Sequence, residues 1–129
     1  MAFEENARLD YIGMCAFSQT KLSEVRIPAS VQEVGADAFS WCRGLESVRF
    51  EAGSRLREIG YKAFMTVSIR EVQIPACVSV IRPYAFSNCA NLESVTFGEG
   101  SQLEVIMHCA FSHCGRLLSI AIPSCATVE

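Results

Sequence analysis

The chain has 129 residues, of which 50% are hydrophobic and 19% charged, and its formal net charge at neutral pH is −3. This composition is typical of a compact folded chain rather than a disordered one. The basic residues are scattered, which argues against a surface for nucleic acid or an anionic membrane. No stretch approaches the roughly 20 apolar residues of a membrane span, so we expect neither a nucleic-acid partner nor membrane insertion.

The dipeptide Ala-Phe recurs five times and divides the chain into repeats. Its phenylalanines are Phe17, Phe39, Phe64, Phe86 and Phe111, so the spacings between them run 22, 25, 22 and 25. A regular period of this size, roughly 20 to 29 residues, is typical of a solenoid built from short repeats. Because the spacing alternates, the duplicated unit is a pair of repeats, 47 residues long.

A run with the alternation of a strand follows each phenylalanine. The five runs are LSEVRI, LESVRF, IREVQI, LESVTF and LLSIAI, starting at Leu22, Leu45, Ile69, Leu92 and Leu117. Apolar residues at positions 4 and 6, with polar residues between them, predict a strand with one buried face. Three runs end in Ile-Pro, at Pro28, Pro75 and Pro123. Proline has no amide to continue a ladder, so these strands should stop there.

The remaining segments of each repeat predict turns. Every second link after a strand is longer and contains Gly53 or Gly100, which supply the backbone freedom for a wider turn. The segments AFSWC, AFSNC and AFSHC are too short for an independent helix. We therefore expect single helical or 3₁₀ turns there, on the side opposite the strands.

Residues 27–48 read IPASVQEVGADAFSWCRGLESV. This segment resembles the repeat of the BspA-like, or Treponema pallidum type, leucine-rich repeat family, which approximates Ile-Pro-x-x-Val-x-x-Ile-Gly-x-x-Ala-Phe-x-x-Cys-x-x-Leu-x-x-Val. Arg82 and Met107 stand in place of the usual glycine, and Thr20 and Val67 in place of the cysteine. The resemblance covers essentially the whole chain. It implies a leucine-rich repeat solenoid of about five repeats whose length alternates between 22 and 25, with a parallel β-sheet on one face and short helical or 3₁₀ turns on the other.

The same resemblance implies a function and a location. Proteins of this family are typically on the surface of, or secreted by, host-associated bacteria and protists, and are commonly associated with adhesion and protein recognition. The family has no catalytic residues to carry over, and its binding partners differ between members. A cell-surface or secreted location is therefore expected from the resemblance alone, since residues 1–9 lack the features of a signal peptide.

The two ends of the sequence both fall within a repeat. Phe3 aligns with Phe50 and Phe97 at offsets of 47 residues, and SCATVE at the other end begins a sixth repeat. Solenoids normally cover their terminal repeats with a polar cap. We expect residues 1–129 to be a single leucine-rich repeat domain and a segment of a longer array, whose uncapped ends could self-associate.

The seven cysteines fall into three columns of the repeat. Cys42, Cys89 and Cys114 follow the phenylalanine by three residues, Cys15 and Cys109 precede it by two, and Cys77 and Cys125 follow the strand. Adjacent repeats lie about 4.8 Å apart at the strands, so only Cys89 with Cys114 comes near disulfide range, roughly 4.4–6.8 Å between Cα atoms. Buried free thiols that pack as small apolar groups are the favoured interpretation.

Neither a metal site nor an active site is expected. In the densest cluster, the columns of Cys109 and Cys114 should point inward while those of His108 and His113 face solvent, and zinc needs four convergent ligands. The sequence contains no phosphate-binding glycine loop and no nucleophile elbow. We therefore predict a non-enzymatic protein that needs no cofactor.

The outward positions of the strands are the candidate binding residues. Positions 3 and 5 of each run share one solvent face and vary in type, so we predict that a protein partner contacts Glu24, Arg26, Ser47, Arg49, Glu71, Gln73, Ser94 and Thr96. The partner could be a host or matrix protein. Two alternatives remain: a structural spacer or self-associating array, and an intracellular partner-binding scaffold. The feature that would separate the spacer alternative from recognition is the last run, in which Leu118 and Ala121 replace charged or polar residues of the earlier runs.

Overall fold

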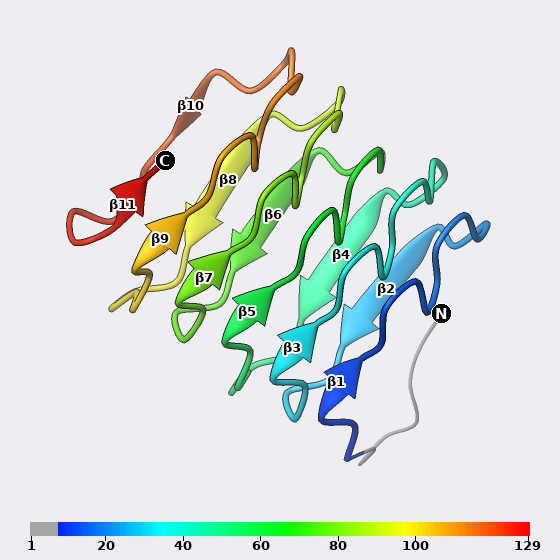
Figure 1. Cartoon of the computed structure of the whole chain (residues 1–129), viewed down its shortest axis with the longest axis horizontal. Helices are drawn as coiled ribbons and strands as arrows, with labels where there is room; N and C mark the ends of the chain where they lie inside the picture. Colours follow the sequence, from blue (N-terminus) through cyan, green and yellow to red (C-terminus); the bar gives the residue numbers. More distant parts are fainter. Residues whose placement is uncertain (1–7) are drawn as a thin grey trace.

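The computed structural model describes residues 8–129, which wind into about five coils of a parallel β-solenoid (Figure 1). Each coil contributes a short strand, a turn segment and a longer strand. The short strands pair in chain order into one six-stranded sheet: β1 Tyr11–Ile12, β3 Glu33–Val34, β5 Glu58–Ile59, β7 Val80–Ile81, β9 Val105–Ile106 and β11 Thr127–Val128. The longer strands are β2 Glu24–Ile27, β4 Ser47–Phe50, β6 Glu71–Ile74, β8 Ser94–Phe97 and the shorter β10 Ser119–Ile120.

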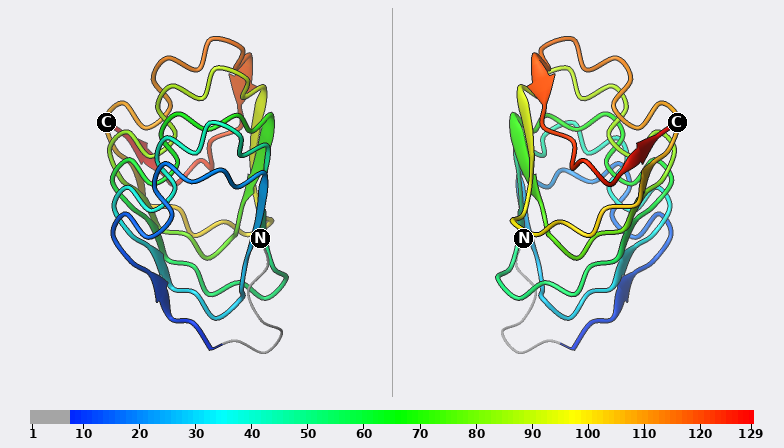
Figure 2. Two further views of the ribbon diagram at one scale, coloured as in Figure 1. Left: turned by 90° about the vertical axis from the view of Figure 1, so that its right-hand side faces the viewer. Right: turned by 90° about the vertical axis from the view of Figure 1, so that its left-hand side faces the viewer.

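The two sets of strands lie on opposite sides of each coil and enclose the core (Figure 2). The predicted strands are confirmed: in β2 and β6 exposed and buried residues alternate, as the period-2 pattern requires. The six-stranded sheet was not anticipated as a sheet, because each of its strands contributes only two residues. Parallel strands therefore occupy two faces of the solenoid: the expected face, and a second one that the prediction did not include.

A stack of phenylalanine rings runs through the core. Phe39, Phe64 and Phe86 are fully buried, and their ring centroids lie 5.2 and 5.3 Å apart with nearly parallel planes. Phe17 and Phe111 extend the stack at its two ends, at 5.2 and 5.3 Å, but are only half-buried. The Ala-Phe repeat thus marks the axis along which the coils stack.

The segments around the phenylalanines form hydrogen-bonded turns, and the expectation of helical or 3₁₀ turns there is wrong. Among residues 8–129 the structure contains no helix. The reason is backbone conformation: every one of these segments has two residues with φ between 55° and 61°, at Cys15, Gln19, Asp37, Trp41, Lys62, Thr66, Tyr84, Asn88, Cys109 and His113. A residue in the left-handed region ends a right-handed turn, so no helix can propagate.

Backbone bonds in these turns alternate between two kinds of partner. Ala16 donates its amide to Gly13 within the same turn, at 3.2 Å, whereas Phe17 donates to Ala38 of the next coil at 2.8 Å. The same alternation recurs in the later coils, for example with Phe64 donating to Ala85 at 2.7 Å. The turn side is therefore a third hydrogen-bonded face, which ties successive coils together without being a regular sheet.

The wider turns form where the glycines predict them. Gly53 and Gly100 have φ of 77° and 75°, values that L side chains rarely adopt. Phe3, which aligns with Phe50 and Phe97 in the sequence, lies outside the described residues. No helix within residues 8–129 is long and apolar enough to cross a bilayer.

The sheet of longer strands is interrupted. β2 pairs with β4 and β6 pairs with β8 over all four residues, but β10 pairs with β8 over only two. β4 and β6 lie side by side without a hydrogen-bonded ladder, so this face consists of a two-stranded and a three-stranded sheet. The interruption falls in the middle of the face that carries the candidate binding residues.

Candidate binding face

The eight predicted binding residues all lie on the outer side of the longer strands. Ladder registry places Glu24 beside Ser47 and Arg26 beside Arg49, and it places Glu71 beside Ser94 and Gln73 beside Thr96. Two of the eight, Ser47 and Ser94, are half-buried. The other six are exposed: Glu24, Arg26, Arg49, Glu71, Gln73 and Thr96. We call the outer side of β2, β4, β6 and β8 the binding face.

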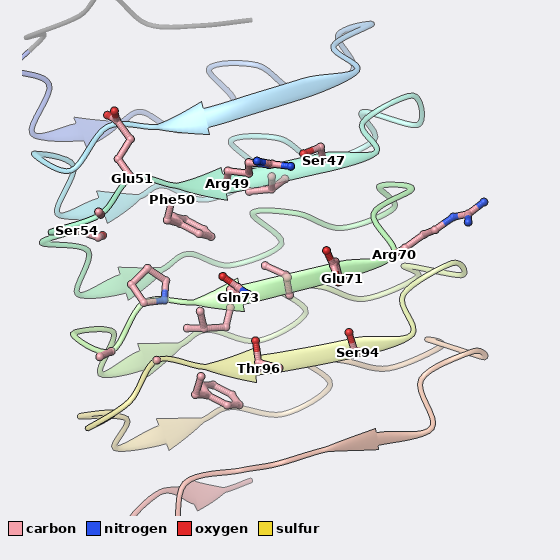
Figure 3. Close-up of a pocket in the computed structure, with 18 of the residues that line it drawn as sticks. Ser47, Arg49, Phe50, Glu51, Ser54, Arg70, Glu71, Gln73, Ser94 and Thr96 are labelled. Atoms are coloured by element: carbon pink, nitrogen blue, oxygen red, sulfur yellow. The ribbon is translucent and has the colours of Figure 1, made fainter.

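A hollow of about 1320 Å³ lies over the binding face, bounded by the strands β4, β6 and β8 and the links that follow them (Figure 3). Six of the predicted residues line it: Ser47, Arg49, Glu71, Gln73, Ser94 and Thr96. Glu24 and Arg26 lie outside it, on β2. The structure therefore brings together most of the predicted set and leaves its N-terminal pair on the adjoining surface.

The hollow also contains charged residues that the sequence analysis did not single out. Glu46, Arg70 and Glu93 line it from the position just before each strand, and Glu51 lines it from the link after β4. Glu46, Arg70 and Glu93 occupy position 2 of the repeated run, which is polar in each of the three coils whose strands border the hollow. This pattern could have identified these three residues from the sequence, but not Glu51. The lining mixes four carboxylates with two guanidinium groups, an arrangement suited to polar and ionic contacts with a macromolecule.

Three cysteines of one column have a structural role. The thiols of Cys42, Cys89 and Cys114 donate to the carbonyl oxygens of Phe17, Phe64 and Phe86 of the preceding coil, at 3.0, 3.3 and 3.2 Å. Cys42 and Cys89 are fully buried, as predicted. This column therefore satisfies backbone carbonyls beside the phenylalanine stack.

The other cysteine columns differ from the prediction. Cys15, Cys109 and Cys125 are exposed, so the expectation that the column of Cys109 points inward is wrong. Cys15 and Cys109 occupy one of the two positive-φ positions of the turn, with φ of 57° in both, and this conformation directs their side chains outward. All seven cysteines of the structure are free thiols.

Cys89 and Cys114 form a thiol pair across adjacent coils. The interaction with Cys114, together with burial, raises the pKa of the Cys89 thiol, whereas the interaction with Cys89 lowers the pKa of Cys114. Cys114 is also the less buried of the two. The thiolate of this pair therefore forms at Cys114, which makes Cys114 the nucleophile if the pair oxidises.

We expect the thiols to react in two groups. In the native protein Cys15, Cys109 and Cys125 should react within the mixing time of a bulky thiol reagent, while buried Cys42 and Cys89 should react slowly, because a reagent must reach the sulfur atom. Mild oxidation should join only Cys89 to Cys114. Mass mapping of labelled and oxidised protein checks both statements, and a native bridge joining Cys15 to Cys42 would contradict the repeat register.

The two histidines lie on the turn side. The rings of His108 and Tyr84 meet edge-on, with their centroids 5.7 Å apart. The rings of Tyr84 and Tyr61 meet in the same way, with their centroids 6.1 Å apart. The neighbouring Cys109 raises the pKa of the Tyr84 hydroxyl. Among residues 8–129, no group of three or more His, Cys, Asp or Glu side chains is arranged to hold a metal ion.

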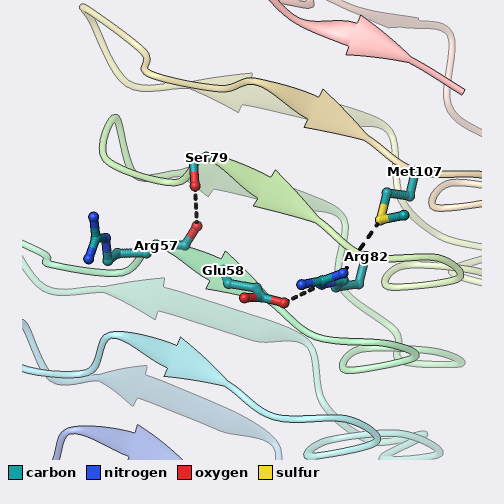
Figure 4. Close-up of polar contacts among 5 residues, drawn as sticks. All are labelled: Arg57, Glu58, Ser79, Arg82 and Met107. Carbon is teal, nitrogen blue, oxygen red and sulfur yellow. Dashed lines mark hydrogen bonds and ion pairs between the residues drawn. The ribbon is translucent and has the colours of Figure 1, made fainter.

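An ion pair joins two coils on the side opposite the binding face (Figure 4). Arg82 donates to the Glu58 carboxylate, which raises the pKa of the guanidinium through this hydrogen bond. Both side chains are partly exposed, so the pair contributes little stability. Arg82 stands where Gly35 and Gly60 stand in earlier coils, and its side chain runs outward along the six-stranded sheet.

These features define a parallel β-solenoid of short repeats that offers an exposed polar face. The BspA type leucine rich repeat region matches residues 10–129 in six copies. The chain belongs to this family of leucine-rich repeat proteins, as its repeat motif predicts. None of the curated protein sequences is significantly similar to the chain.

Several solved structures are similar to this solenoid. The pneumococcal vaccine antigen PcpA is 28% identical with a TM-score of 0.74, and the match covers 80% of this chain and 27% of PcpA. A leucine-rich repeat protein from Bacteroides capillosus is 32% identical with a TM-score of 0.60, over 68% of this chain and 62% of the other. A leucine rich cell surface protein from Faecalibacterium prausnitzii is 24% identical with a TM-score of 0.54, and the match covers 86% of this chain and 42% of the other. The chain thus spans less than two thirds of each of these proteins.

Proposed function

We propose that this solenoid is a non-catalytic recognition and adhesion module that binds a protein partner through the binding face. The observation that carries the proposal is the hollow over β4, β6 and β8, whose volume of about 1320 Å³ exceeds the roughly 300–1,000 Å³ of small-molecule pockets. Its polar and charged lining suits the rim of a protein interface. Arg49, at its edge, belongs to a residue type enriched among interface anchors.

We further propose that the protein acts at the cell surface or after secretion, with a host or matrix protein as its partner. Support comes from what two similar structures are called: a pneumococcal vaccine antigen and a leucine rich cell surface protein. Because this chain has the same repeat architecture, we propose the same location for it. An intracellular scaffold would use the same face and differ only in compartment.

The test changes the charge of the binding face without touching the core. Arg26 and Arg49 are ladder neighbours and both are exposed, so they form a local positive spot. We expect R26E/R49E to fold normally, because exposed substitutions usually shift the free energy of unfolding by no more than about 0.5 kcal/mol. Association with an acidic partner should become slower, since charged residues of an interface steer encounter.

The assay compares surface binding of wild type, R26E/R49E and a control on candidate host proteins, with circular dichroism to verify folding. The control, R57E/K62E, makes the same change in net charge next to β5, outside the hollow. Reduced binding by R26E/R49E alone supports the proposal. Equal binding by wild type and R26E/R49E would place the site elsewhere and direct the search to the turn side that carries Trp41.

A spacer or self-associating array is the second candidate function. The specific observation in its favour is Leu118 in the last coil, whose side chain is 92% exposed, with Ile122 and Val128 exposed nearby. Absence of binding by all three proteins, together with concentration-dependent association in sedimentation velocity, would favour this function over recognition.

A further inference from the structure

The longer strands pair two by two, in step with the 47-residue unit of the sequence. Glu24–Ile27 pairs along its whole length with Ser47–Phe50, and Glu71–Ile74 does so with Ser94–Phe97. The interfaces between these pairs are weaker. β8 meets β10 over two residues, and β4 meets β6 with no ladder at all.

The residue that follows each strand accounts for this alternation. At the fully paired interfaces it donates an amide to the preceding strand: Glu51 to the carbonyl of Ile27 at 3.0 Å, and Gly98 to that of Ile74 at 2.9 Å. At β4/β6 and β8/β10 the equivalent residues are Pro75 and Pro123. Proline has no amide, and within a sheet it removes a ladder hydrogen bond. Both interfaces with an amide pair over four residues, whereas the interfaces with a proline pair over two residues at β8/β10 and over none at β4/β6.

The β4/β6 interface is nevertheless held on its other two sides. On the turn side, Phe39 donates to Ala63 and Trp41 donates to Met65, both at 2.8 Å. On the opposite face, β3 pairs with β5 in regular parallel register. The rings of Phe39 and Phe64 stack across the interface at 5.2 Å, the spacing found elsewhere in the core. The two coils are therefore joined along two faces. On the binding face the Ser68 amide donates to the carbonyl of Leu45 and the Cys77 thiol to that of Ser54, each at 2.9 Å, but no ladder joins β4 to β6 between these end contacts.

We propose that the β4/β6 interface is a hinge, at which the unit β2–β4 and the unit β6–β8 tilt relative to one another about the bonded turn side. Residues on both sides of this interface line the hollow: Glu46–Ser54 from one unit, and Ser68 and Arg70–Cys77 from the next. Tilting at this point changes the curvature of the binding face while the phenylalanine stack stays in contact. The hinge goes beyond the proposed function and can be tested without any partner.

Amide hydrogen exchange measured by NMR tests the hinge in the wild-type protein. In a parallel strand successive residues direct their amides alternately to the two neighbouring strands. The carbonyl of Ile74 accepts from Gly98, the residue after β8, so the amides of Glu71 and Gln73 are directed toward β4. We expect them to exchange at least about tenfold faster than the equivalent amides of Ser47 and Arg49, because local opening exposes them before the coil unfolds. Equal protection of the two pairs would overturn the proposal.

A reciprocal pair of variants assigns the effect to proline. Pro75→Ala restores an amide opposite the carbonyl of Phe50, and exchange at Glu71 and Gln73 should slow by about tenfold or more, toward the rates of Ser47 and Arg49. Glu51→Pro removes the bond to Ile27 and should accelerate Ser47 and Arg49 by a similar factor. Circular dichroism and protected amides at Phe39 and Phe64 show that each variant is folded. Unchanged exchange at Glu71 and Gln73 in folded Pro75→Ala would overturn the hinge, even if Glu51→Pro does not fold.

Discussion

Replacing Phe86 with alanine should lower the free energy of unfolding by roughly 3–5 kcal/mol. The side chain is fully buried, and its ring stacks on Phe64 and on Phe111, each at 5.3 Å. Truncation leaves a cavity between two coils that cannot close, because the backbone on each side is bonded to its neighbours. Because a solenoid is stabilised by interfaces between adjacent repeats, the damage should spread to the coils above and below. Urea denaturation followed by circular dichroism measures the loss.

Phe111→Ala is the matched control for this substitution. It removes the same side chain from the same column, but Phe111 is half-buried at the end of the stack. Its cost should therefore be clearly smaller than that of Phe86→Ala. A loss under about 1 kcal/mol for Phe86→Ala, below the usual cost of such a cavity, would contradict the assignment of this column as the structural core.

Gly60→Ala should destabilise the solenoid by about 1–3 kcal/mol, the usual cost of overpacking. A Cβ atom at Gly60 would lie 2.5 Å from the carbonyl oxygen of Val34 and 2.9 Å from the amide nitrogen of Ala36. These are backbone atoms, and the Val34 carbonyl is already fixed as the acceptor of the Gly60 amide at 2.8 Å. The coils must separate locally to admit the methyl group. The measurement is again the free energy of unfolding in urea.

Gly115→Ala provides the control, because no atom lies within 4 Å of the added Cβ and its φ needs no glycine. It should change stability by no more than about 0.5 kcal/mol. Arg82 and Met107 occupy the position of Gly60 in later coils, and their amides donate to the preceding coil at 2.9 Å, so those coils accept a side chain at this position. If Gly60→Ala changed the free energy of unfolding as little as Gly115→Ala, that result would contradict the close approach of the second and third coils at Gly60.

The outward position of the candidate binding residues could be predicted because strand alternation is local. In a strand, neighbouring side chains point to opposite faces, so buried Val72 and Ile74 place Glu71 and Gln73 outside. The hollow could not be predicted in the same way, because it depends on how three strands and their links are spaced across coils. Arg26 was assigned to the same site as Gln73, yet only Gln73 lines the hollow.

The turn side shows the opposite case, in which local reasoning gave the wrong conformation. The short segments around Phe39 and Phe86 suggested helical turns, but each of their bonds within a turn alternates with a bond to the next coil. Every second amide thus donates its hydrogen bond to the neighbouring coil, whereas in a helix all of these amides would donate within the segment. The same geometry turned Cys109 outward, although its column was expected to be buried.

The repeat, its alternating length, the phenylalanine column and the residues of the longer strands could all be read from the amino-acid sequence, because each follows from the spacing of residues along the chain. Which coils are joined on which face became clear only from the way the coils stack. Pro75 shows why: its missing amide is a local property, but its consequence is an unpaired interface with β4, a strand that ends a full repeat earlier in the chain, at Phe50, and is brought alongside only when the coils stack.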